Sequence, residues 1–326
     1  MNLLHISIVI SAKNEADNIS ALINSLKNIN YPQNKYEIIL VDDSSTDLTL
    51  LKAESCRNDI NNLKIVQAEN KKYPGKKGAL EVGIQNAVND YILITDADCI
   101  VSPGWLKEYS AKFSKGYDFL FGNAPFSKQQ GFVNTLSCFE NLRTFFLYTT
   151  ALRINIPYSA AARNFGFKKS SFNKIKGYEN TNETISGDDD LLIREAVKNN
   201  MKIGYIPDKN ASVYSSTPAS IKDYLVQKTR HTKTSLYYLP VHKLFLGSWH
   251  LLNIVLLLTL ILGFYNKWFF IPFIIKIAAD IIIVKTNEGR FNYSFTLFEI
   301  IYLQILYEIL IVINFVNALF RKDKWK

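Results

Sequence analysis

A short apolar run that ends in two acidic residues constrains the fold of this chain more than any other feature. Residues 91–99 read Tyr-Ile-Leu-Ile-Thr-Asp-Ala-Asp-Cys. Such a run is typical of a strand buried on both faces of a parallel sheet, and ligands of open α/β sheets bind where strands end. Residues two apart in an extended chain point the same way, so Asp96 and Asp98 can share one hard cation that holds a diphosphate. A capping role for either acid fits this motif alone equally well.

Strand-like and helix-like patterns alternate through the first part of the chain. Because strands and helices that alternate form parallel sheets covered on both faces, we expect an α/β fold of the Rossmann-like kind with a mostly parallel sheet. Polar residues follow the strands, so several loops should meet at one rim of the sheet. The expected strands are Ile6–Ile10, Tyr36–Val41, Leu63–Val66 and the run before Asp96. Helices are expected at 17–28, between Asp47 and about residue 57, and at 78–89.

Apolar residues crowd into the end of the chain, from Leu244 to Phe320. The formal net charge is +9, but no basic helix interleaved with aromatic residues is present, and we expect no nucleic-acid partner. The basic excess instead flanks the apolar segments, which fits the positive-inside rule and contact with anionic lipid. These flanking residues are Lys222, Lys228, Arg230, Lys233 and Lys243 before the segments, and Arg321, Lys322, Lys324 and Lys326 after them.

We therefore predict two regions, a cytoplasmic domain at 1–235 and a membrane region at 236–326. Segments 244–264 and 268–284 should form a transmembrane hairpin, and 295–320 is a third apolar helix with scattered polar residues. An even number of crossings keeps the domain and the basic tail on one side, so the protein is expected to be a multi-pass protein of the cell (inner) membrane. The N-terminus shows no signal region, so insertion should depend on these C-terminal segments.

Four motifs in order resemble one enzyme family. They are Ile8-Val-Ile-Ser-Ala-Lys-Asn-Glu15, Val41-Asp-Asp-Ser-Ser-Thr-Asp47, Gly75-Lys-Lys-Gly-Ala-Leu80 and Thr95-Asp-Ala-Asp98. Together they look like the GT-A domain of the inverting glycosyltransferase family that includes cellulose, chitin and hyaluronan synthases. The resemblance covers residues 6 to about 235 and implies a nucleotide-sugar donor, a divalent cation (Mg²⁺ or Mn²⁺) and a membrane-anchored bacterial enzyme of the hexosyltransferase type.

The resemblance also implies roles in donor binding. An acceptor carboxylate can take the imide N–H of uracil, and a lysine can face the phosphates as a point charge. Helix capping competes for the second acid of the D-D-S-S turn, and a solvated loop competes for the lysines. The implied donor residues are Ser11, Lys13, Glu15, Asp43, Lys76 and Asp96, and the implied metal ligands are Asp96 and Asp98.

Residues 186–194, Ser-Gly-Asp-Asp-Asp-Leu-Leu-Ile-Arg, resemble the family's Glu-Asp-x-x-Leu motif, in which the Asp is the general base. Asp188 takes the Glu place and Asp189 the Asp place. An inverting transfer needs one base to remove the proton of the acceptor hydroxyl. Acids at a helix N-terminus are favoured by its dipole, and we assign that structural role to Asp190.

Two further stretches resemble acceptor and donor segments of the family. Arg163 and Asn164 are possible sugar contacts, although a buried strand with a polar turn competes equally. Gln227-Lys-Thr-Arg-His231 resembles the Gln-x-x-Arg-Trp motif of processive synthases, in which the arginine contacts the diphosphate and the tryptophan lines the acceptor channel. Gln227 and Arg230 are therefore donor candidates and His231 an acceptor candidate; His in place of Trp favours single-sugar addition.

The leading hypothesis is inverting transfer of a sugar from a nucleotide-sugar donor, a UDP-sugar, to a hydroxyl of a lipid-linked or membrane-proximal saccharide, for synthesis of cell-surface polysaccharide or glycolipid. An aspartyl-phosphate-type phosphatase would also use a strand followed by D-x-D, but it leaves the N-E and D-D-S-S loops without a role. An inactive carbohydrate-binding membrane module is the third hypothesis, and the intact acids count against it.

Overall fold

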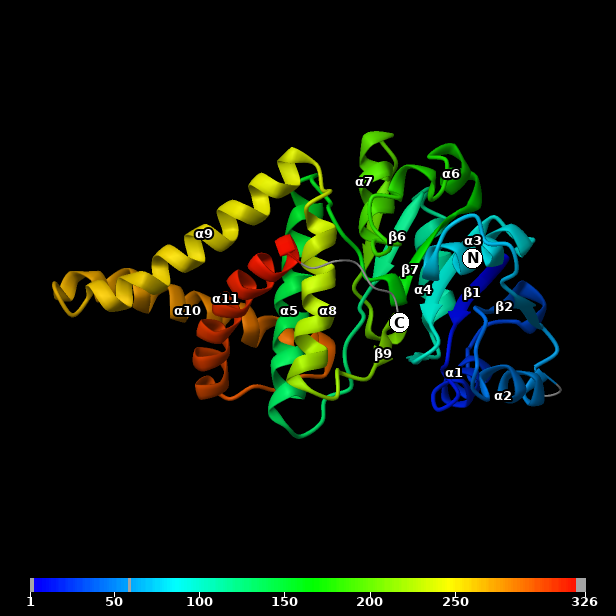
Figure 1. Ribbon diagram of the computed structural model, residues 1–326, viewed down its shortest axis with the longest axis horizontal. Coiled ribbons are helices and arrows are strands. Elements are labelled where there is room, and N and C mark those ends of the chain that lie inside the picture. Colours follow the sequence, from blue (N-terminus) through cyan, green and yellow to red (C-terminus); the bar gives the residue numbers. More distant parts are fainter. Residues whose placement is uncertain (1–2, 58–59, 321–326) are drawn as a thin grey trace. The chain divides into compact units, whose positions relative to one another are not determined.

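The repeated strand and helix pattern forms a seven-stranded sheet in the computed structural model (Figure 1). The strand order is β3-β2-β1-β4-β7-β6-β8. Strands β1 to β4 pair in parallel, whereas β7 runs antiparallel to both of its neighbours. The expected α/β class with a mostly parallel sheet is therefore confirmed. The strands are β1 Ile6–Ala12, β2 Tyr36–Asp42, β3 Leu63–Gln67, β4 Tyr91–Asp96, β6 Phe119–Gly122, β7 Phe165–Lys168 and β8 Ile203–Ile206, with a separate antiparallel pair, β5 Cys99–Val101 and β9 Val213–Ser215.

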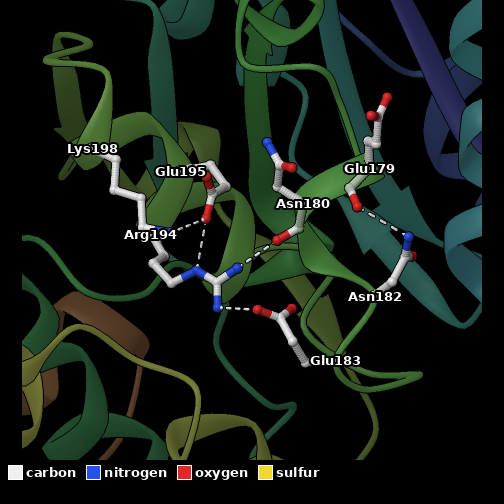
Figure 2. A pocket seen from close by; sticks show the side chains of 7 residues that line it. All are labelled: Glu179, Asn180, Asn182, Glu183, Arg194, Glu195 and Lys198. Carbon is white, nitrogen blue, oxygen red and sulfur yellow. Dashed lines mark hydrogen bonds and ion pairs between the residues drawn. The ribbon is translucent and has the colours of Figure 1, made fainter.

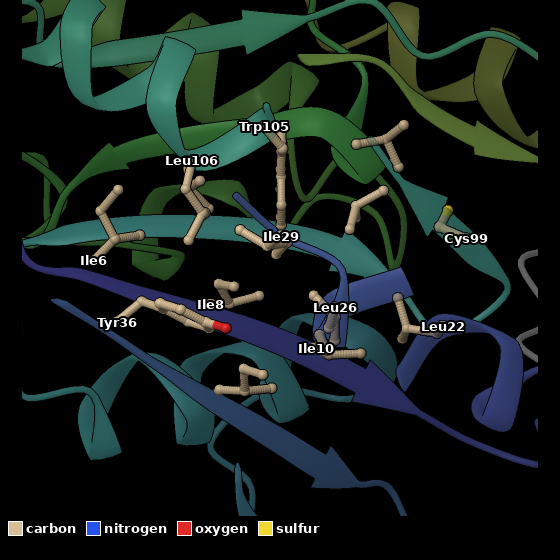
Figure 3. Packing of buried hydrophobic residues seen from close by; sticks show 14 of the residues in the cluster. Ile6, Ile8, Ile10, Leu22, Leu26, Ile29, Tyr36, Cys99, Trp105 and Leu106 are labelled. Carbon is tan, nitrogen blue, oxygen red and sulfur yellow. The ribbon is translucent and has the colours of Figure 1, made fainter. Parts of the chain in front are cut away.

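Alternation of side chains along β1 explains why helices cover both faces of the sheet. Ile6, Ile8 and Ile10 share one buried cluster with residues of helices α1 (Ile19–Lys27) and α4 (Trp105–Phe113), as Figure 3 shows. Val9 points to the other face, toward α3 (Gly75–Asn86). A Cβ on Gly83 of α3 would lie 2.4 Å from the Val9 side chain, so a glycine is what lets this helix approach the sheet.

The remaining helices of this part are short, and one begins earlier than expected. The sequence predicted a loop up to Lys77, but α3 starts at Gly75, directly after Pro74. Both lysines of the motif therefore stand in the first helical turn. The other helices are α2 Thr49–Ser55, α6 Lys169–Lys174 and α7 Asp190–Lys198, with short 3-10 turns at Gln33–Lys35, Ala162–Asn164, Glu179–Thr181 and Lys209–Ala211.

The structure describes residues 3–57 and 60–320, which divide into two units. The sheet unit contains the described residues of 3–127 and 151–216, and the helical unit contains 128–150 and 217–320. This division differs from the predicted boundary at residue 235. Most of α5 (Phe132–Arg153) and all of α8 (Ile221–Ser235) group with the C-terminal helices. The basic tail at 321–326 lies outside the described residues.

The helical unit contains three apolar helices, α9 (Pro240–Leu262), α10 (Phe270–Asn287) and α11 (Leu297–Phe320). Among the described helices, α9 and α11 are long and apolar enough to cross a membrane, with mean hydropathies of 2.0 and 1.9. Helix α10, the second arm of the predicted hairpin, contains Lys276 and Asp280 and does not meet this criterion. Helices α9 and α10 fold back on one another, and α11 packs on α8 and α10 (Figure 1).

Candidate active site

The carboxyl edge of the sheet brings together the ends of three strands. The pairing register sets Ser11 of β1 opposite Asp96 of β4, and Ala12 opposite Asp42 of β2. The Asp43 N–H donates a hydrogen bond of 2.8 Å to the Ala12 carbonyl. The D-D-S-S turn and the D-x-D motif therefore flank the end of β1, at the edge where open α/β sheets bind ligands.

Asp96, Asp98 and Cys99 form a candidate metal-binding group, with ligand atoms that lie within 4.8 Å of one another. Partial desolvation and then the Asp96 carboxylate raise the pKa of Asp98, while Arg163 opposes the shift. Burial holds the pKa of the Cys99 thiol well above its ordinary value. The two carboxylates of the group offer hard oxygen ligands, which suit Mg²⁺ or Mn²⁺ better than a soft metal.

Lys76 connects the D-x-D motif to the second acidic motif. Its Nζ lies 2.6 Å from Asp96 Oδ1 and 2.8 Å from Asp188 Oδ2. Burial disfavours the ammonium, but the two carboxylates outweigh burial and hold the pKa of Lys76 well above its ordinary value. A fixed positive charge therefore lies between the end of β4 and the start of α7.

The three acids before α7 make different contacts. Asp189 is the N-cap: its Oδ1 accepts the Asp190 N–H at 2.8 Å, and its Oδ2 accepts the Ala162 N–H at 2.6 Å. Asp190 accepts a hydrogen bond from the Ser159 hydroxyl. The sequence assigned Asp190 the role of an acid favoured by the helix dipole, and Asp190 does stand in the first turn of α7; the N-cap itself is Asp189. The helix begins at Asp190, so the residue before it is the one whose side chain faces the free N–H groups.

The electrostatic surroundings of Asp188 and Asp189 push their pKa values in opposite directions. Burial, then the neighbouring carboxylates of Asp190 and Asp188, raise the pKa of Asp189 well above its ordinary value. Burial would also raise the pKa of Asp188, but Lys76 outweighs it and the pKa is lowered. Because basicity rises with pKa, Asp189 is the better proton acceptor of the two.

The loops after β1 and β2 are locked together by hydrogen bonds. The Glu15 N–H donates to Thr49 Oγ1 at 2.7 Å, and Glu15 Oε2 accepts from Asn18 Nδ2 at 2.7 Å. Asp47 accepts the N–H groups of Ala16, at 3.1 Å, and Thr49, at 2.9 Å. Glu15 is thus held at the rim of the sheet by Thr49, the first residue of α2, and by Asn18, while Asp47 of the D-D-S-S turn holds the neighbouring Ala16.

Asp43 is 3% exposed, and its carboxylate pairs with Lys71, which lies in the loop before α3 and was not among the expected site residues. The partner was missed because only the folded path of the loop before α3 brings it to the end of β2. Ser11 and Lys13 are half-buried at the end of β1.

Arg163 and Asn164, both expected near an acceptor, lie in different surroundings. The Arg163 guanidinium lies 4.4 Å from the centre of the Phe126 ring and is close enough to lower the pKa of Asp98. Asn164 is 0% exposed, and its Oδ1 accepts from Trp105 Nε1 at 2.9 Å and from the Tyr109 hydroxyl at 2.8 Å. Its amide donates to two backbone carbonyls as well. The acceptor role expected for Asn164 is therefore corrected to a structural one, because the protein interior uses its hydrogen-bonding groups.

Gln227, Arg230 and His231 lie on α8, in the helical unit. His231 is exposed, and the other two are half-buried. Their contacts with the donor and acceptor stay predictions.

Two buried cations hold the segment that leads to the acids of α7, and the sequence indicated neither role. Lys77 is 2% exposed, and its Nζ donates to the carbonyls of Thr181 and Thr184, the latter at 3.0 Å. Arg194 of α7 donates to Glu183 at 2.7 Å. A helix that starts at Gly75 sends two consecutive lysines in different directions, so the true helix start was the missing signal.

Arg194 also lines an open polar pocket (Figure 2). Most of its charged side chains are paired with one another: Glu195 lies 2.9 Å from Arg194 and 2.8 Å from Lys198. None of the predicted site residues lines this pocket, and we assign it no ligand. Its lining residues are Glu179, Asn180, Asn182, Glu183, Arg194, Glu195 and Lys198.

Comparison with curated proteins finds glycosyltransferases. The chain is 30% identical over 127 residues to glycosyltransferase AglE of Haloferax volcanii, a match that covers 39% of this chain and 41% of that protein. It is 34% identical over 110 residues (33% and 19%) to the poly(ribitol-phosphate) beta-N-acetylglucosaminyltransferase TarS of Staphylococcus aureus. It is 33% identical over 101 residues (31% and 22%) to the beta-monoglucosyldiacylglycerol synthase of Nostoc. The matches thus span about two fifths or less of these relatives.

Solved structures show the same fold. The mannosyltransferase PcManGT of Pyrobaculum calidifontis, in complex with GDP-Man and Mn²⁺, superposes with a TM-score of 0.61 at 16% identity and covers 98% of this chain and 88% of that one. TarS residues 1–349 of S. aureus, in complex with UDP-GlcNAc, gives 0.51 at 23% identity over 74% and 69%. These likenesses confirm the GT-A fold expected from the motifs.

The family model described as "Glycosyl transferase family 2" matches residues 7–176, just over half of the chain. That range contains the N-E loop, the D-D-S-S turn, the G-K-K-G motif and the D-x-D motif. The chain belongs to glycosyl transferase family 2.

Proposed function

We propose that this protein transfers a hexosyl group from a nucleotide-sugar donor, a UDP-sugar, to an acceptor hydroxyl with inversion at the anomeric carbon. The observation that carries the proposal is the position of Lys76 between Asp96 and Asp188. One side chain joins the D-x-D motif, which serves the diphosphate, to the acidic motif that contains the base. The residues proposed to bind the donor and the motif proposed to contain the base therefore lie beside the same ammonium group.

The donor side of the reaction requires a divalent cation and a cationic side chain. Asp96 and Asp98 would hold Mg²⁺ or Mn²⁺, because their carboxylates are the hard oxygen ligands of the group. Such an ion, when bound, neutralises negative charge on the diphosphate as it leaves. Lys76 faces the same phosphates, since its ammonium lies 2.6 Å from Asp96.

Asp189 is proposed as the general base that removes the proton of the acceptor hydroxyl. Its raised pKa makes it a stronger base than an ordinary aspartate, and its two hydrogen bonds to backbone N–H groups fix its orientation. Asp188 holds Lys76 and so links base and donor. Glu15, Asp43, Ser11 and Lys13 are proposed to bind the nucleoside at the end of β1 and β2.

The acceptor is proposed to be a lipid-linked or membrane-proximal saccharide, used in synthesis of cell-surface polysaccharide or glycolipid. The apolar helices α9 and α11 support attachment to the cytoplasmic face of the cell membrane. The similarity to a diacylglycerol glucosyltransferase supports an acceptor that resides in lipid. Arg163, Gln227, Arg230 and His231 are the further contacts that we propose for the bound substrates.

The test is incubation of the purified full chain with Mn²⁺ or Mg²⁺ and a panel of nucleotide sugars, with release of free UDP or GDP as the readout. We expect UDP release from at least one UDP-sugar, its loss in Asp98→Ala, and no change in Glu54→Gln, an exposed acid on α2 of the same unit. Hydrolysis of small phosphomonoesters without UDP release would point to a phosphatase. Absence of any nucleotide binding would point to an inactive module, and either result would overturn the proposal.

A further inference from the structure

A cluster of charged and polar side chains is buried inside the helical unit. Arg143 of α5 is 1% exposed on its side chain, and its Nη1 lies 2.7 Å from Asp280 Oδ1 of α10. The Lys276 ammonium donates to the other Asp280 oxygen at 2.5 Å. Glu308 of α11 lies 3.2 Å from His250 of α9 and 4.0 Å from the Arg143 guanidinium. Four helices, three of them apolar, therefore meet at one ionic centre.

The cluster ties the apolar helices to a helix that carries several buried polar and charged side chains, Glu140, Asn141 and Arg143 among them. Helix α5 is not among the described helices that are long and apolar enough to cross a membrane. Its Glu140 pairs with Lys228 of α8 at 3.1 Å, and its Asn141 accepts a hydrogen bond of 3.0 Å from the Tyr293 hydroxyl. An Arg143 that extends from such a polar helix fixes the ionic centre at the water-facing side of any membrane that the unit contacts.

The apolar length beyond this centre is short. At 1.5 Å per residue, the stretch from His250 to the end of α9 is about 18 Å long, and the stretch from Lys276 back to the start of α10 is about 9 Å long. A helix needs about 30 Å to cross the hydrocarbon core of a bilayer. Neither arm of the hairpin reaches that length.

Helix α11 has a second attachment to a polar helix. Its Asn314 is 2% exposed and accepts a hydrogen bond of 3.4 Å from the Thr229 hydroxyl of α8. Glu308 and Asn314 are six residues apart, so α11 is held to polar partners at two points along its length. The apolar stretch beyond Asn314 is about 9 Å long. This helix, too, is not free to cross a bilayer.

The other faces of these helices still require an apolar partner. Leu251, Phe264, Tyr265 and Trp268 are 63%, 82%, 88% and 67% exposed, and only 11% of the apolar window of α9 is buried. A continuous apolar surface of this kind marks a site of interaction with lipid or protein. Lys243 is exposed at the base of the hairpin, where a cation suits anionic headgroups, and Tyr and Trp at its tip are typical of membrane contact. Lys285, at the end of α10, is paired with Glu288 at 3.0 Å. Lipid therefore fits this surface better than a protein partner does.

We propose that the helical unit is monotopic: it embeds the α9–α10 hairpin and the outer face of α11 in a single leaflet of an anionic bilayer and crosses none. Zero crossings keep both ends of the described helical unit on one side, as the charge distribution requires, and need no charged group at the bilayer centre. The inference replaces the multi-pass arrangement expected from the sequence. It rests on the proposed membrane attachment and is independent of the sugar transfer.

The test labels single cysteines with a membrane-impermeant maleimide. The background is Cys56→Ser, because Cys99 and Cys138 are buried. Tyr265→Cys places a thiol at the hairpin tip, and Arg290→Cys, at an exposed residue beyond the far end of α10, is the matched control. The full chain is expressed in a bacterium, and labelling is compared between spheroplasts and inverted inner-membrane vesicles.

We expect Arg290→Cys to be labelled in inverted vesicles alone, and Tyr265→Cys to stay unlabelled in spheroplasts whether or not it reacts in inverted vesicles. Labelling of Tyr265→Cys in spheroplasts would show a crossing and overturn the inference. Trp268→Cys gives a second reading of the same tip if the first variant does not accumulate. Flotation on a density gradient is run first: a chain that stays soluble as a dimer would have covered the surface with a second copy, which also overturns the inference. UDP release, measured in parallel, shows whether the proposed activity stands or fails separately.

Discussion

The substitution Asp189→Asn tests the proposed general base separately from the residues that bind the donor. The substitution keeps the size of the side chain but removes its ability to accept a proton. General bases contribute about 10²- to 10⁴-fold to a rate, which corresponds to about 2.7–5.4 kcal/mol of transition-state stabilisation. We therefore expect kcat to fall at least about 100-fold. The nucleotide contacts that we propose lie elsewhere, so the Kd for UDP should change by less than about threefold.

The same substitution has a structural cost that must be measured beside activity. Asp189 accepts two backbone N–H groups, one on each oxygen, at 2.8 and 2.6 Å. An asparagine has one acceptor oxygen, so one N–H loses its partner and faces an amide donor. The loss of one such bond costs about 1–3 kcal/mol. Urea unfolding should show a decrease in the free energy of unfolding of that size, while UDP binding reports that the donor site still forms.

Asp190→Asn is the matched control. Asp190 accepts a hydrogen bond from the Ser159 hydroxyl, and an asparagine carbonyl can accept the same bond. Because the Asp190 carboxylate is one of the groups that raise the pKa of Asp189, Asp190→Asn should lower the pH midpoint of kcat/KM. Above that midpoint it should keep kcat within about tenfold, far from the loss expected for Asp189→Asn. The assay is initial-rate UDP release with the donor and acceptor that the panel identifies. If Asp189→Asn kept more than half of the wild-type kcat, the base assignment would be wrong, and Asp188 would be the next residue to test.

Three further predictions concern the same edge of the sheet. Burial and neighbouring carboxylates raise the pKa of Asp189, and the base acts when it is deprotonated. We therefore expect kcat/KM to rise with pH through a midpoint above the ordinary aspartate pKa of about 3.9. A midpoint at or below about 4 would contradict the assignment. Lys76→Met should raise the KM for the donor about ten- to hundredfold, measured by initial rates, because a charge-assisted contact to the phosphates is lost; an unchanged KM would place the lysine outside the donor site. Lys77→Met should lower the free energy of unfolding in urea by about 2–4 kcal/mol, because two buried carbonyls lose their donor, and a variant as stable as wild type would refute that structural role.

Local patterns predicted the strands of the sheet well. The apolar runs of β1, β2, β3 and β4 are continuous, are followed by polar loops and pair with neighbours that come early in the chain. Strand β5 gave no such signal. It has three residues, Cys99–Val101, and its partner β9 begins only at Val213. A pattern within one short segment carries no information about so distant a partner.

The site was predicted less completely than the sheet, for reasons that individual residues show. The Pro74-Gly75 pair is typical of a turn, yet α3 begins there because Gly78 leaves room for the preceding loop: a Cβ on it would lie 2.0 Å from the Tyr73 carbonyl oxygen. Asn164 was uncertain because a polar residue between apolar ones fits both a ligand contact and a satisfied core amide. In the folded protein, Trp105 and Tyr109 of α4 donate hydrogen bonds to it, so Asn164 is a core amide whose hydrogen-bonding groups are satisfied.

The division of the chain into units follows ion pairs between residues that lie far apart in the sequence. Arg143 and Asp280 are 137 residues apart, and each in isolation looks like a solvated or interfacial charge. Together they make α5 part of the helical unit, although α5 stands in the chain between the D-x-D motif and the proposed base. The chain must therefore pass between the two units at 127–128, 150–151 and 216–217. Buried opposite charges stabilise a structure only when their partners are present. Removal of Arg143 alone would leave two separate pairs, Asp280 with Lys276 and Glu308 with His250. The helical unit would then lose its ionic link between α5 and α10, while Glu140–Lys228 and Asn141–Tyr293 remain. We therefore expect the stability of this unit to depend in part on a residue far outside the apolar C-terminal segments.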